Sequence, residues 1–391
     1  MEGRLSALYS RLWTGLVGSG AGTSCYHRNQ CCSGAPAYRY RIVEHKAHAS
    51  AHRILINPDL ATMLKEPFEH LWRGQLEAAC QGMTCSRVPW SDNVSGSVAM
   101  LTVRSAYHVT HMVKDLEAAT ALYTHVFQPP IQADGYHEGE NRDASFASIC
   151  DAYIELFAPR DVAAPNPTSN GARYLRRAGE SLCNFGWLVD DKIPDAIRFC
   201  EGLGYTLVYV AGPTRYAFFI HPKQAHGMML EIAAETIPED PRIEPGWAER
   251  WRDKHPLGIE RMNAVTYAVQ DIDGALGLLQ ELTDAPVIHR ALNEAGDEES
   301  AFVAVADHVI EVRRSCMDSS EVARFIHTKG PQIHSVTFKV RDLAQAHDYL
   351  RGLGLRVIAH EPASAIAIDP EEMLGACYYF TDRAIPSDPR A

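Results

Sequence analysis

Four stretches of the chain share one pattern, and they read His108-Val-Thr-His-Met-Val-Lys-Asp115, Asn184-Phe-Gly-Trp-Leu-Val-Asp-Asp191, Ala264-Val-Thr-Tyr-Ala-Val-Gln-Asp271 and Ser335-Val-Thr-Phe-Lys-Val-Arg-Asp342. In each, a short apolar strand ends in a valine, and an aspartate follows two residues later. The aspartates lie 76, 80 and 71 residues apart. An internal repeat of this kind is stronger evidence for the fold than local propensity is.

A second marker has the same spacing. The first three copies end in apolar strands that carry Glu155, Glu231 and Glu311, which are again 76 and 80 residues apart. Two markers that move together indicate a true repeat of one structural unit.

Each copy predicts a βαβββ unit. The aspartate can cap the following helix, because its carboxylate accepts a hydrogen bond from the unpaired N–H groups of the first turn. Apolar residues then recur at helical spacing, as Leu116, Ala119 and Tyr123 do in the first copy. Glycines end the helices, and three β-rich segments follow.

The pattern His-x-x-x-x-Val-x-Asp-Leu at 108–116, the four repeats and the strand glutamates resemble the vicinal oxygen chelate superfamily. That superfamily includes glyoxalase I, methylmalonyl-CoA epimerase, extradiol ring-cleavage dioxygenases and the fosfomycin- and bleomycin-resistance proteins. The resemblance covers roughly residues 100–383. It implies an α+β fold in which four βαβββ modules pair into two cupped mixed β-sheets.

The longest interruption between modules, residues 234–260, is rich in proline and charge and predicts a domain boundary. We therefore expect a first domain at 100–235, with modules one and two, and a second at 261–385, with modules three and four. Residues 1–99 lack the repeat and hold ten basic against seven acidic residues, whereas the remainder holds 27 against 42. We interpret residues 1–99 as an N-terminal extension of uncertain structure, and one interpretation is that it contributes nothing to the fold.

The resemblance implies four metal ligands in the first cup, namely His108, Glu155, Asn184 and Glu231. One imidazole and two carboxylates suit a divalent ion such as Fe²⁺, Zn²⁺, Ni²⁺, Co²⁺ or Mn²⁺. Such an ion would act as a Lewis acid toward two neighbouring substrate oxygens, and Glu155 or Glu231 would be the catalytic base. Asn184 departs from the His or Gln that is usual at its position. A relic pocket without metal therefore stays an alternative.

Other polar residues receive plainer interpretations. Strand alternation places His111 on the opposite face from His108, against the helix, so we expect a structural role. Cys183 is interpreted as a small apolar filler and His226 as a turn residue. His137, Glu138 and Glu140 lie on a polar loop that either covers the substrate or is simply solvated.

The second cup is expected to be degenerate. Its ligand positions are Ala264, Glu311 and Ser335, and the fourth module is expected to stop before a strand that would carry a fourth glutamate. His334 is one residue out of register, which predicts that it faces the other side of the sheet. Extradiol dioxygenases of the superfamily keep two His and one Glu in their last two modules, so this cup argues against ring cleavage. It would stabilise the first cup or close over its substrate.

These observations favour a metal-dependent lyase or isomerase of the glyoxalase and epimerase type that chelates vicinal oxygens of a small organic substrate. The alternatives are a divergent Fe(II)-dependent dioxygenase that uses the first cup and a metal-free small-molecule binding or resistance protein. A formal net charge of −12 disfavours nucleic acid, and no apolar run approaches the ~18 residues of a membrane span. We expect a cytoplasmic protein with a small-molecule partner, and a homodimer is compatible with this interpretation.

Overall fold

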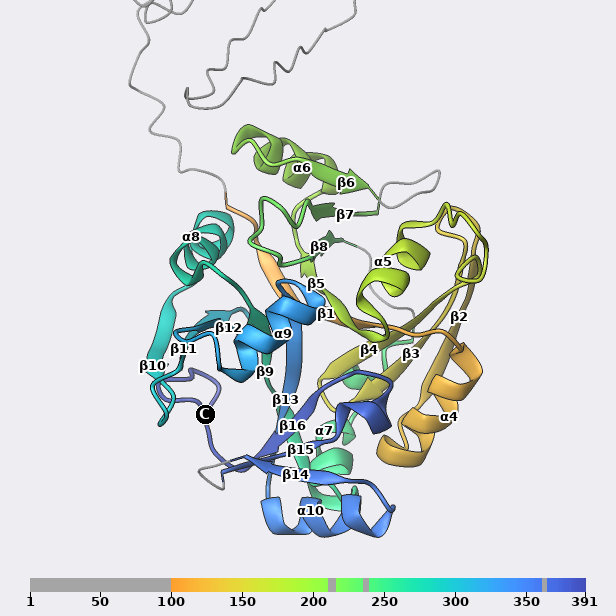
Figure 1. Cartoon of the computed structure of the whole chain (residues 1–391), viewed down its shortest axis with the longest axis vertical. Helices are drawn as coiled ribbons and strands as arrows, with labels where there is room; N and C mark the ends of the chain where they lie inside the picture. The colour runs from red at the N-terminus through yellow and green to blue at the C-terminus, as the bar shows by residue number, and fades with distance from the viewer. Residues whose placement is uncertain (1–99, 210–215, 235–238, 361–363) are drawn as a thin grey trace, which may run out of the picture. The chain divides into compact units, whose positions relative to one another are not determined.

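The computed structural model describes residues 100–391 except 210–215, 235–238 and 361–363. These residues belong to one compact unit. The N-terminal extension predicted at 1–99 lies outside the described residues. Two eight-stranded mixed sheets with flanking helices form the unit (Figure 1).

The first sheet has the strand order β2-β3-β4-β1-β5-β8-β7-β6. Its strands are β1 (Val103–Met112), β2 (Ile131–His137), β3 (Arg142–Ile149), β4 (Ala152–Pro159), β5 (Ser181–Val189), β6 (Leu207–Tyr209), β7 (Ala217–Ile220) and β8 (Leu230–Ala233). Strands β1 and β5, the first strands of modules one and two, pair antiparallel at the centre. Each also pairs in parallel with the last strand of its own module.

The second sheet repeats this order as β10-β11-β12-β9-β13-β16-β15-β14. Its strands are β9 (Ile259–Ala268), β10 (Val287–Leu292), β11 (Glu298–Val305), β12 (His308–Ser315), β13 (Gln332–Val340), β14 (Val357–His360), β15 (Ala365–Ile368) and β16 (Tyr378–Thr381). The predicted α+β fold of four βαβββ modules in two paired sheets is confirmed.

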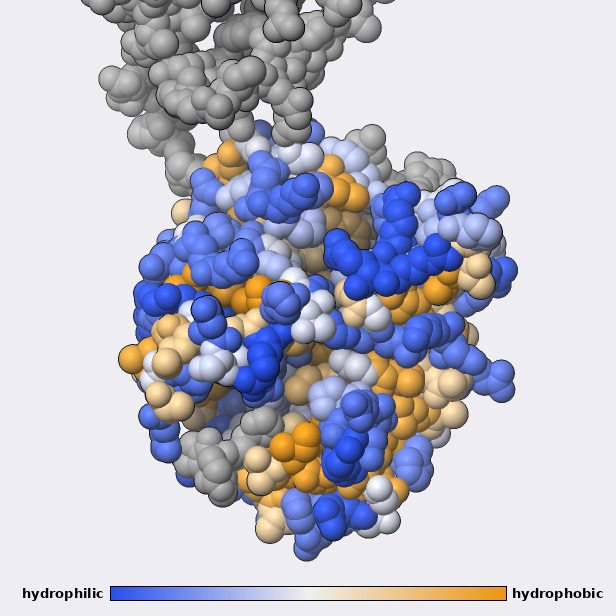
Figure 2. Space-filling view, viewed as in Figure 1, coloured by the Kyte–Doolittle hydropathy of each residue, from blue (hydrophilic) through white to orange (hydrophobic). Residues whose placement is uncertain are grey.

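The helices are α4 (Leu116–Phe127), α5 (Asn170–Ala178), α6 (Ile193–Gly202), α7 (Trp247–Glu249), α8 (Ile272–Thr283), α9 (Glu321–Lys329) and α10 (Leu343–Gly352), with a π-helix at Arg250–Lys254 and 3-10 turns at Pro241–Ile243 and Pro370–Met373. None of these helices is long and apolar enough to cross a membrane. Large apolar side chains exposed to solvent include Ile243, Leu292 and Met317. Figure 2 shows hydrophilic residues over much of one face, with apolar residues in patches between them.

Three of the four predicted caps are present. The carboxylates of Asp115, Asp271 and Asp342 each accept a hydrogen bond of 3.0 Å from the backbone N–H three residues ahead. The prediction for Asp191 is wrong, because the residue three positions ahead is Pro194, which has no N–H to donate. The Asp191 carboxylate instead accepts the N–H of Thr102 at 2.6 Å.

We call the first sheet with its helices the first domain and the second sheet with its helices the second domain, and the contacts between them come in matched pairs. Before β8, the turn at His226 and Gly227 (φ 54° and 93°) packs against Pro331, just ahead of β13. Before β16, the turn at Leu374 and Gly375 (φ 52° and 78°) packs against Glu180, just ahead of β5. At both glycines a Cβ atom would overlap the facing backbone. Each domain thus uses the same turn to dock on the other.

His111 takes part in this docking. It is fully buried, its Nδ1 lies 2.8 Å from the hydroxyl of Tyr123 on α4, and its Nε2 lies 3.0 Å from the carbonyl of Leu374. Its counterpart in the second domain, Tyr267, donates across the same interface to the carbonyl of Met229. His111 is therefore structural, as predicted.

Candidate active site in the first cup

The four predicted ligand positions converge on one face of the first sheet, which we call the first cup. His108, Glu155, Asn184 and Glu231 come from β1, β4, β5 and β8, which are adjacent in the sheet. All four are buried. The Nε2 atom of His108 lies 3.2 Å from Oε2 of Glu231 and 3.4 Å from Oε2 of Glu155. The Asn184 amide donates to the same Glu231 oxygen at 2.9 Å.

A β-bulge in β1 aims His108 into this cluster. Ala106 pairs with Trp187 and Val109 with Phe185, so Tyr107 and His108 together oppose the single residue Gly186. A bulge of this kind removes the strict alternation of faces. The rings of Tyr107 and His108 consequently lie side by side, with centroids 4.4 Å apart.

Gly186 makes room for both side chains. A Cβ atom at this position would lie 3.1 and 3.2 Å from Cδ1 and Cβ of Tyr107 and 3.4 Å from Cε1 of His108. The first two distances are tighter than ordinary van der Waals contact. The glycine in the second sequence copy thus belongs to the geometry of the site.

Two further polar residues hold Glu155. The Thr110 hydroxyl donates to Oε2 at 2.7 Å and accepts a hydrogen bond from the Asn184 amide at 3.1 Å. The buried guanidinium of Arg142 lies 3.2 Å from Oε1 of Glu155 and donates to Glu140 at 2.9 Å. Sequence reasoning missed both residues. Thr110 left a signal, because the same threonine recurs at 266 and 337, whereas Arg142 on β3 left none.

Burial and charge act in opposite directions at the centre of the cluster. Burial raises the pKa of Glu231, but the His108 ring, the Asn184 amide and Arg142 outweigh it and bring that pKa below its usual value. Burial lowers the pKa of His108, and the charges of Glu231 and Glu155 outweigh it and raise that pKa. In this arrangement the two groups favour an imidazolium beside a carboxylate.

The residues present fit a divalent ion in their chemistry. Among the described residues, Oδ1 of Asn184 has no hydrogen-bond partner, and the ring nitrogens of His108 make no well-aligned hydrogen bond, although Nε2 lies 3.2 Å from Glu231. A ring nitrogen, two carboxylates and an amide oxygen are donors that borderline and hard divalent ions accept. Among the residues that the structure describes, however, no three His, Cys, Asp or Glu side chains are spaced as a metal-binding group. His108 and the two carboxylates contact one another instead.

An aromatic wall lies beside the polar cluster. Tyr107, Phe146 and Tyr153 form a buried group, and Tyr216 and Phe219 pack against it. Burial and the nearby Glu231 charge raise the pKa of Tyr107, so its hydroxyl stays protonated. The Tyr153 hydroxyl donates to Asp240 at 2.7 Å, and the Arg242 guanidinium lies over the Tyr153 ring.

The remaining predicted residues fall outside the cluster. His137 lies 2.7 Å from Asp134, Glu138 is exposed, and Glu140 reaches the site only through Arg142. Cys183 is buried against Met112 and Leu175, as predicted for an apolar filler. His226 lies in the turn before β8, also as predicted.

The second sheet corrects the prediction that the fourth module stops before its last strand. Strand β16 is present, and Tyr379 pairs with Thr337 just as Glu231 pairs with Gly186. A four-residue strand without the glutamate marker carried no recognisable signal. The four counterparts of the first-cup residues, which line the second cup, are thus Ala264, Glu311, Ser335 and Tyr379.

The prediction that His334 faces the opposite side is also wrong. Ile333 pairs with Tyr267 and Ser335 with Thr266, so His334 is an extra residue at a bulge and escapes the alternation. Its ring stacks on Tyr379, and its Nδ1 lies 3.1 Å from the Ser335 hydroxyl.

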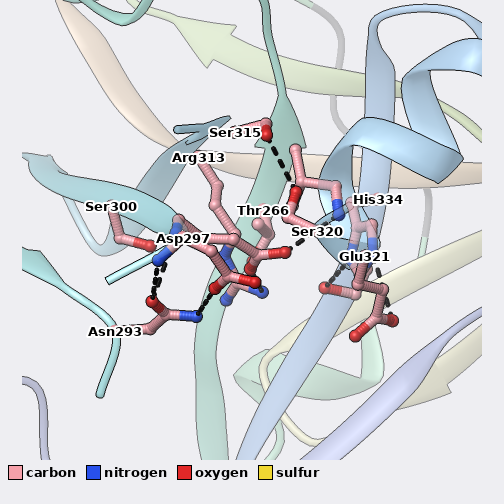
Figure 3. A network of polar contacts seen from close by, with 12 residues as sticks. Thr266, Asn293, Asp297, Ser300, Arg313, Ser315, Ser320, Glu321 and His334 are labelled. Atoms are coloured by element: carbon pink, nitrogen blue, oxygen red, sulfur yellow. Dashed lines mark hydrogen bonds and ion pairs between the residues drawn. The ribbon is translucent and has the colours of Figure 1, made fainter. Parts of the chain in front are cut away.

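In the second cup, Glu311 is fully engaged with protein donors. Thr266 and Ser300 each donate to it at 2.6 Å, and Arg313 donates at 2.8 and 3.0 Å (Figure 3). Burial raises the pKa of Glu311, and the Arg313 charge and these hydrogen bonds outweigh it, so that the pKa is lowered. Ala264 packs against Ile385 near the C-terminus. Ala264 thus stands where the first cup has His108, and protein donors already satisfy Glu311.

No family model and no curated protein matches the sequence. Solved structures with a related fold include a mutant of 4-hydroxymandelate synthase from Streptomyces coelicolor, with a TM-score of 0.55 and 14% identity over 74% of this chain and 96% of that one. A fusion of a xylose isomerase-like TIM barrel with 4-hydroxyphenylpyruvate dioxygenase has a TM-score of 0.50 and 12% identity over 82% of this chain and 54% of that one. Methylmalonyl-CoA epimerase from Mycobacterium tuberculosis is 23% identical over 34% of this chain and 93% of that one, with a TM-score of 0.31. With two sheets of paired βαβββ modules, the chain has the fold of the vicinal oxygen chelate superfamily.

Proposed function

We propose that the protein is an enzyme whose first cup binds a divalent metal ion through His108, Glu155 and Glu231, with Asn184 as a weaker fourth donor. The observation that carries the proposal is the meeting of two buried carboxylates, from β4 and β8, with the buried imidazole of His108 on β1. Two carboxylates held this close in a buried site need positive charge nearby to stay ionised.

The protein supplies only part of that charge. Arg142 is shared among Glu155, Glu140 and Asp134. Within the part of the chain that the structure describes, His108 is the one cationic partner of Glu231 within ion-pair distance. A divalent ion would offset the remaining negative charge and release His108 from its ion pair to act as a neutral nitrogen donor.

Asn184 fits either role in this scheme. Its Nδ2 contacts Thr110 and Glu231, and its Oδ1 has no partner among the residues that the structure describes. The two ends of an amide exchange on a half-turn of the side chain. That rotation would direct the oxygen toward the cluster.

A bound ion of this kind supplies Lewis acidity toward neighbouring oxygens of a substrate. The two carboxylates of the cup have different hydrogen-bond partners, which suit them to different roles. Glu155 is held at both oxygens by Thr110 and Arg142, whereas Glu231 is held at Oε2 alone. Glu231 is therefore the better candidate to take up and return a substrate proton, and Glu155 the better candidate for a fixed donor. Proton transfer next to a carbonyl would give isomerisation or lyase chemistry.

The aromatic wall indicates what such a substrate looks like. Tyr107, Phe146 and Tyr153 present apolar ring surface beside the polar cluster. A small organic molecule with two adjacent oxygens at one end and an apolar body at the other would fill both parts of the cup.

Metal titration of the chelator-treated protein tests the proposal. Wild-type protein should bind close to one equivalent of Zn²⁺ or Co²⁺ by calorimetry. His108→Ala and Glu231→Ala should lose this binding while they keep the wild-type circular dichroism spectrum.

Glu311→Gln is the matched control, because Glu311 has the same strand position and the same threonine partner in the second cup. It should bind metal as the wild type does. Equal metal binding by His108→Ala and wild type would remove the proposed site.

A metal-free binding protein is the second candidate. The direct contacts between His108 and the two carboxylates favour it, because they form an ion-pair cluster made of protein side chains alone. The absence of metal binding in the titration would make this candidate the leading one, and retention of iron with O₂ consumption would point to an oxygenase.

A further inference from the structure

The bulge that aims His108 is held from the other domain. Ala106 is the last regularly paired residue before the bulge, and its N–H donates to Oδ1 of Asp307 at 2.8 Å. Ala106 is buried, so its N–H would be costly to leave without an acceptor. Asp307 lies in the turn between β11 and β12 of the second domain.

The neighbour of Asp307 supports the other side of the bulge. His308 is buried, and its Nδ1 lies 3.0 Å from the same Asp307 oxygen. Its ring packs edge-on against Phe185 at 5.0 Å and lies 6.4 Å from Trp187. These two residues of β5 flank Gly186 and pair with the residues on either side of the bulge. Asp307 and His308 therefore contact β1 and β5, the two strands whose pairing contains the bulge.

The chain contains a reciprocal copy of this contact. Asp151, in the turn between β3 and β4, accepts the N–H of Met262 at 2.6 Å. Met262 occupies the Ala106 position in β9, ahead of a bulge at Asn263. The residue that follows this bulge is Ala264, which has no ligand atom to aim. The hydrogen bond from Ala106 to Asp307 thus supports the strand that carries His108. The equivalent hydrogen bond from Met262 to Asp151 supports a strand that carries no ligand.

We propose that Asp307 is a positioning residue for the first cup, acting through the Ala106 amide on the bulge that turns His108 and Tyr107 toward the two carboxylates. This inference rests on the proposed function, and it gives the second domain, whose own cup lacks the ligand set, a direct part in the first site. A shift of the bulge by one residue would send His108 to the opposite face of the sheet.

Three variants test the proposal. Asp307→Ala removes the acceptor, Asp307→Asn keeps an acceptor oxygen, and Asp151→Ala removes the reciprocal hydrogen bond. Asp307→Ala should weaken Co²⁺ binding by about tenfold or more, as loss of a partner that orients a ligand does, and should change the Co²⁺ absorption bands. Asp307→Asn should restore both. Asp151→Ala should match the wild type in both, although it loses the same kind of contact.

The ring resonances of His108 in the metal-free protein provide a second readout, identified by their loss in His108→Ala. They should move in Asp307→Ala and stay in place in Asp151→Ala. Unchanged affinity, absorption and ring resonances in Asp307→Ala would overturn the inference, as would equal losses in Asp151→Ala. A wild-type protein that binds no Co²⁺ would count against the proposed function instead, and the ring resonances would still decide whether Asp307 positions His108.

Discussion

At the scale of single residues, the two cups differ in which of two paired strands carries the larger side chain. Gly186 stands opposite the bulge that carries Tyr107 and His108. At the same place in the second sheet, Thr337 pairs with Ala264. The larger residue of each pair lies on the opposite strand in the two domains. Gly186 therefore distinguishes the first cup, which holds the predicted ligands, from the second. We expect that even a small side chain at position 186 would disturb the site.

Gly186→Ala tests this. The added methyl would press on Tyr107 and reach His108, so we expect metal affinity to fall by about tenfold, an effect of the size seen when ligand orientation is disturbed. Overpacking of a buried site typically costs about 1–3 kcal/mol, so the protein should remain folded. Calorimetric metal titration beside a urea unfolding curve measures both effects. Full metal affinity in a folded Gly186→Ala protein would show that the glycine is unrelated to the site.

The residues of the candidate site could be named from the sequence only where the repeat marked them. His108, Glu155, Asn184 and Glu231 occupy register positions that four copies define, and the structure brings them together; whether they bind metal stays a prediction. Tyr107 and Arg142 could not be found in this way. Tyr107 enters the cup through a bulge, and Arg142 reaches Glu155 from β3, where the counterpart position in the second domain holds Glu298.

At the scale of elements, the strand and helix of the first module are joined by a buried histidine. His111 on β1 contacts Tyr123 on α4 and the carbonyl of Leu374 in the second domain. Burial lowers the pKa of His111 from 6.5 to about 4. The folded protein therefore keeps this ring neutral at a pH at which the unfolded chain protonates it.

This difference predicts a pH dependence of stability. Between pH 6.5 and about 4 the unfolded chain binds a proton at His111 that the folded protein does not, so the free energy of unfolding falls as the pH falls through this window. The full effect is about 3 kcal/mol, since each pKa unit corresponds to about 1.4 kcal/mol. His111→Phe, which introduces the residue found at the equivalent position 338, should reduce the slope. Equal slopes for the two proteins in urea titrations at pH 7 and 4.5 would contradict this account.

The start of a helix was predictable where the sequence has both a capping aspartate and a residue with a free N–H three positions ahead. Asp115, Asp271 and Asp342 cap their helices because a free N–H lies three residues ahead of each, and Asp191 fails because Pro194 stands there. The bulges in β1 and β13 were not predictable, since a bulge is defined by the pairing of two strands that are distant in sequence. The wrong face assigned to His334 and the omission of Tyr107 have this common cause.

At the scale of the whole molecule, the two sheets share one fold but differ in the side chains that line their cups. In the second cup a guanidinium, a threonine and a serine satisfy Glu311, and Ile385 packs beside Ala264. In the first cup the positions of Ala264 and Glu311 hold His108 and Glu155, and Glu231 adds a second carboxylate. His108 and Arg142 balance the two negative charges only in part. The matched turns and aspartates at the interface connect the two cups, so the second domain can act on the first without a ligand set of its own.

Elemental analysis by inductively coupled plasma mass spectrometry tests the central claim most directly. The purified wild-type protein would be measured beside the double variant Glu155→Ala/Glu231→Ala, both after desalting and after reconstitution with Fe²⁺, Zn²⁺, Ni²⁺, Co²⁺ or Mn²⁺. The account predicts about one equivalent of a divalent metal in the wild type and none in the variant, and the identity of the metal would separate isomerase or lyase chemistry from iron-dependent oxygenation. No metal in the wild type after reconstitution, or equal metal in both proteins, would contradict it.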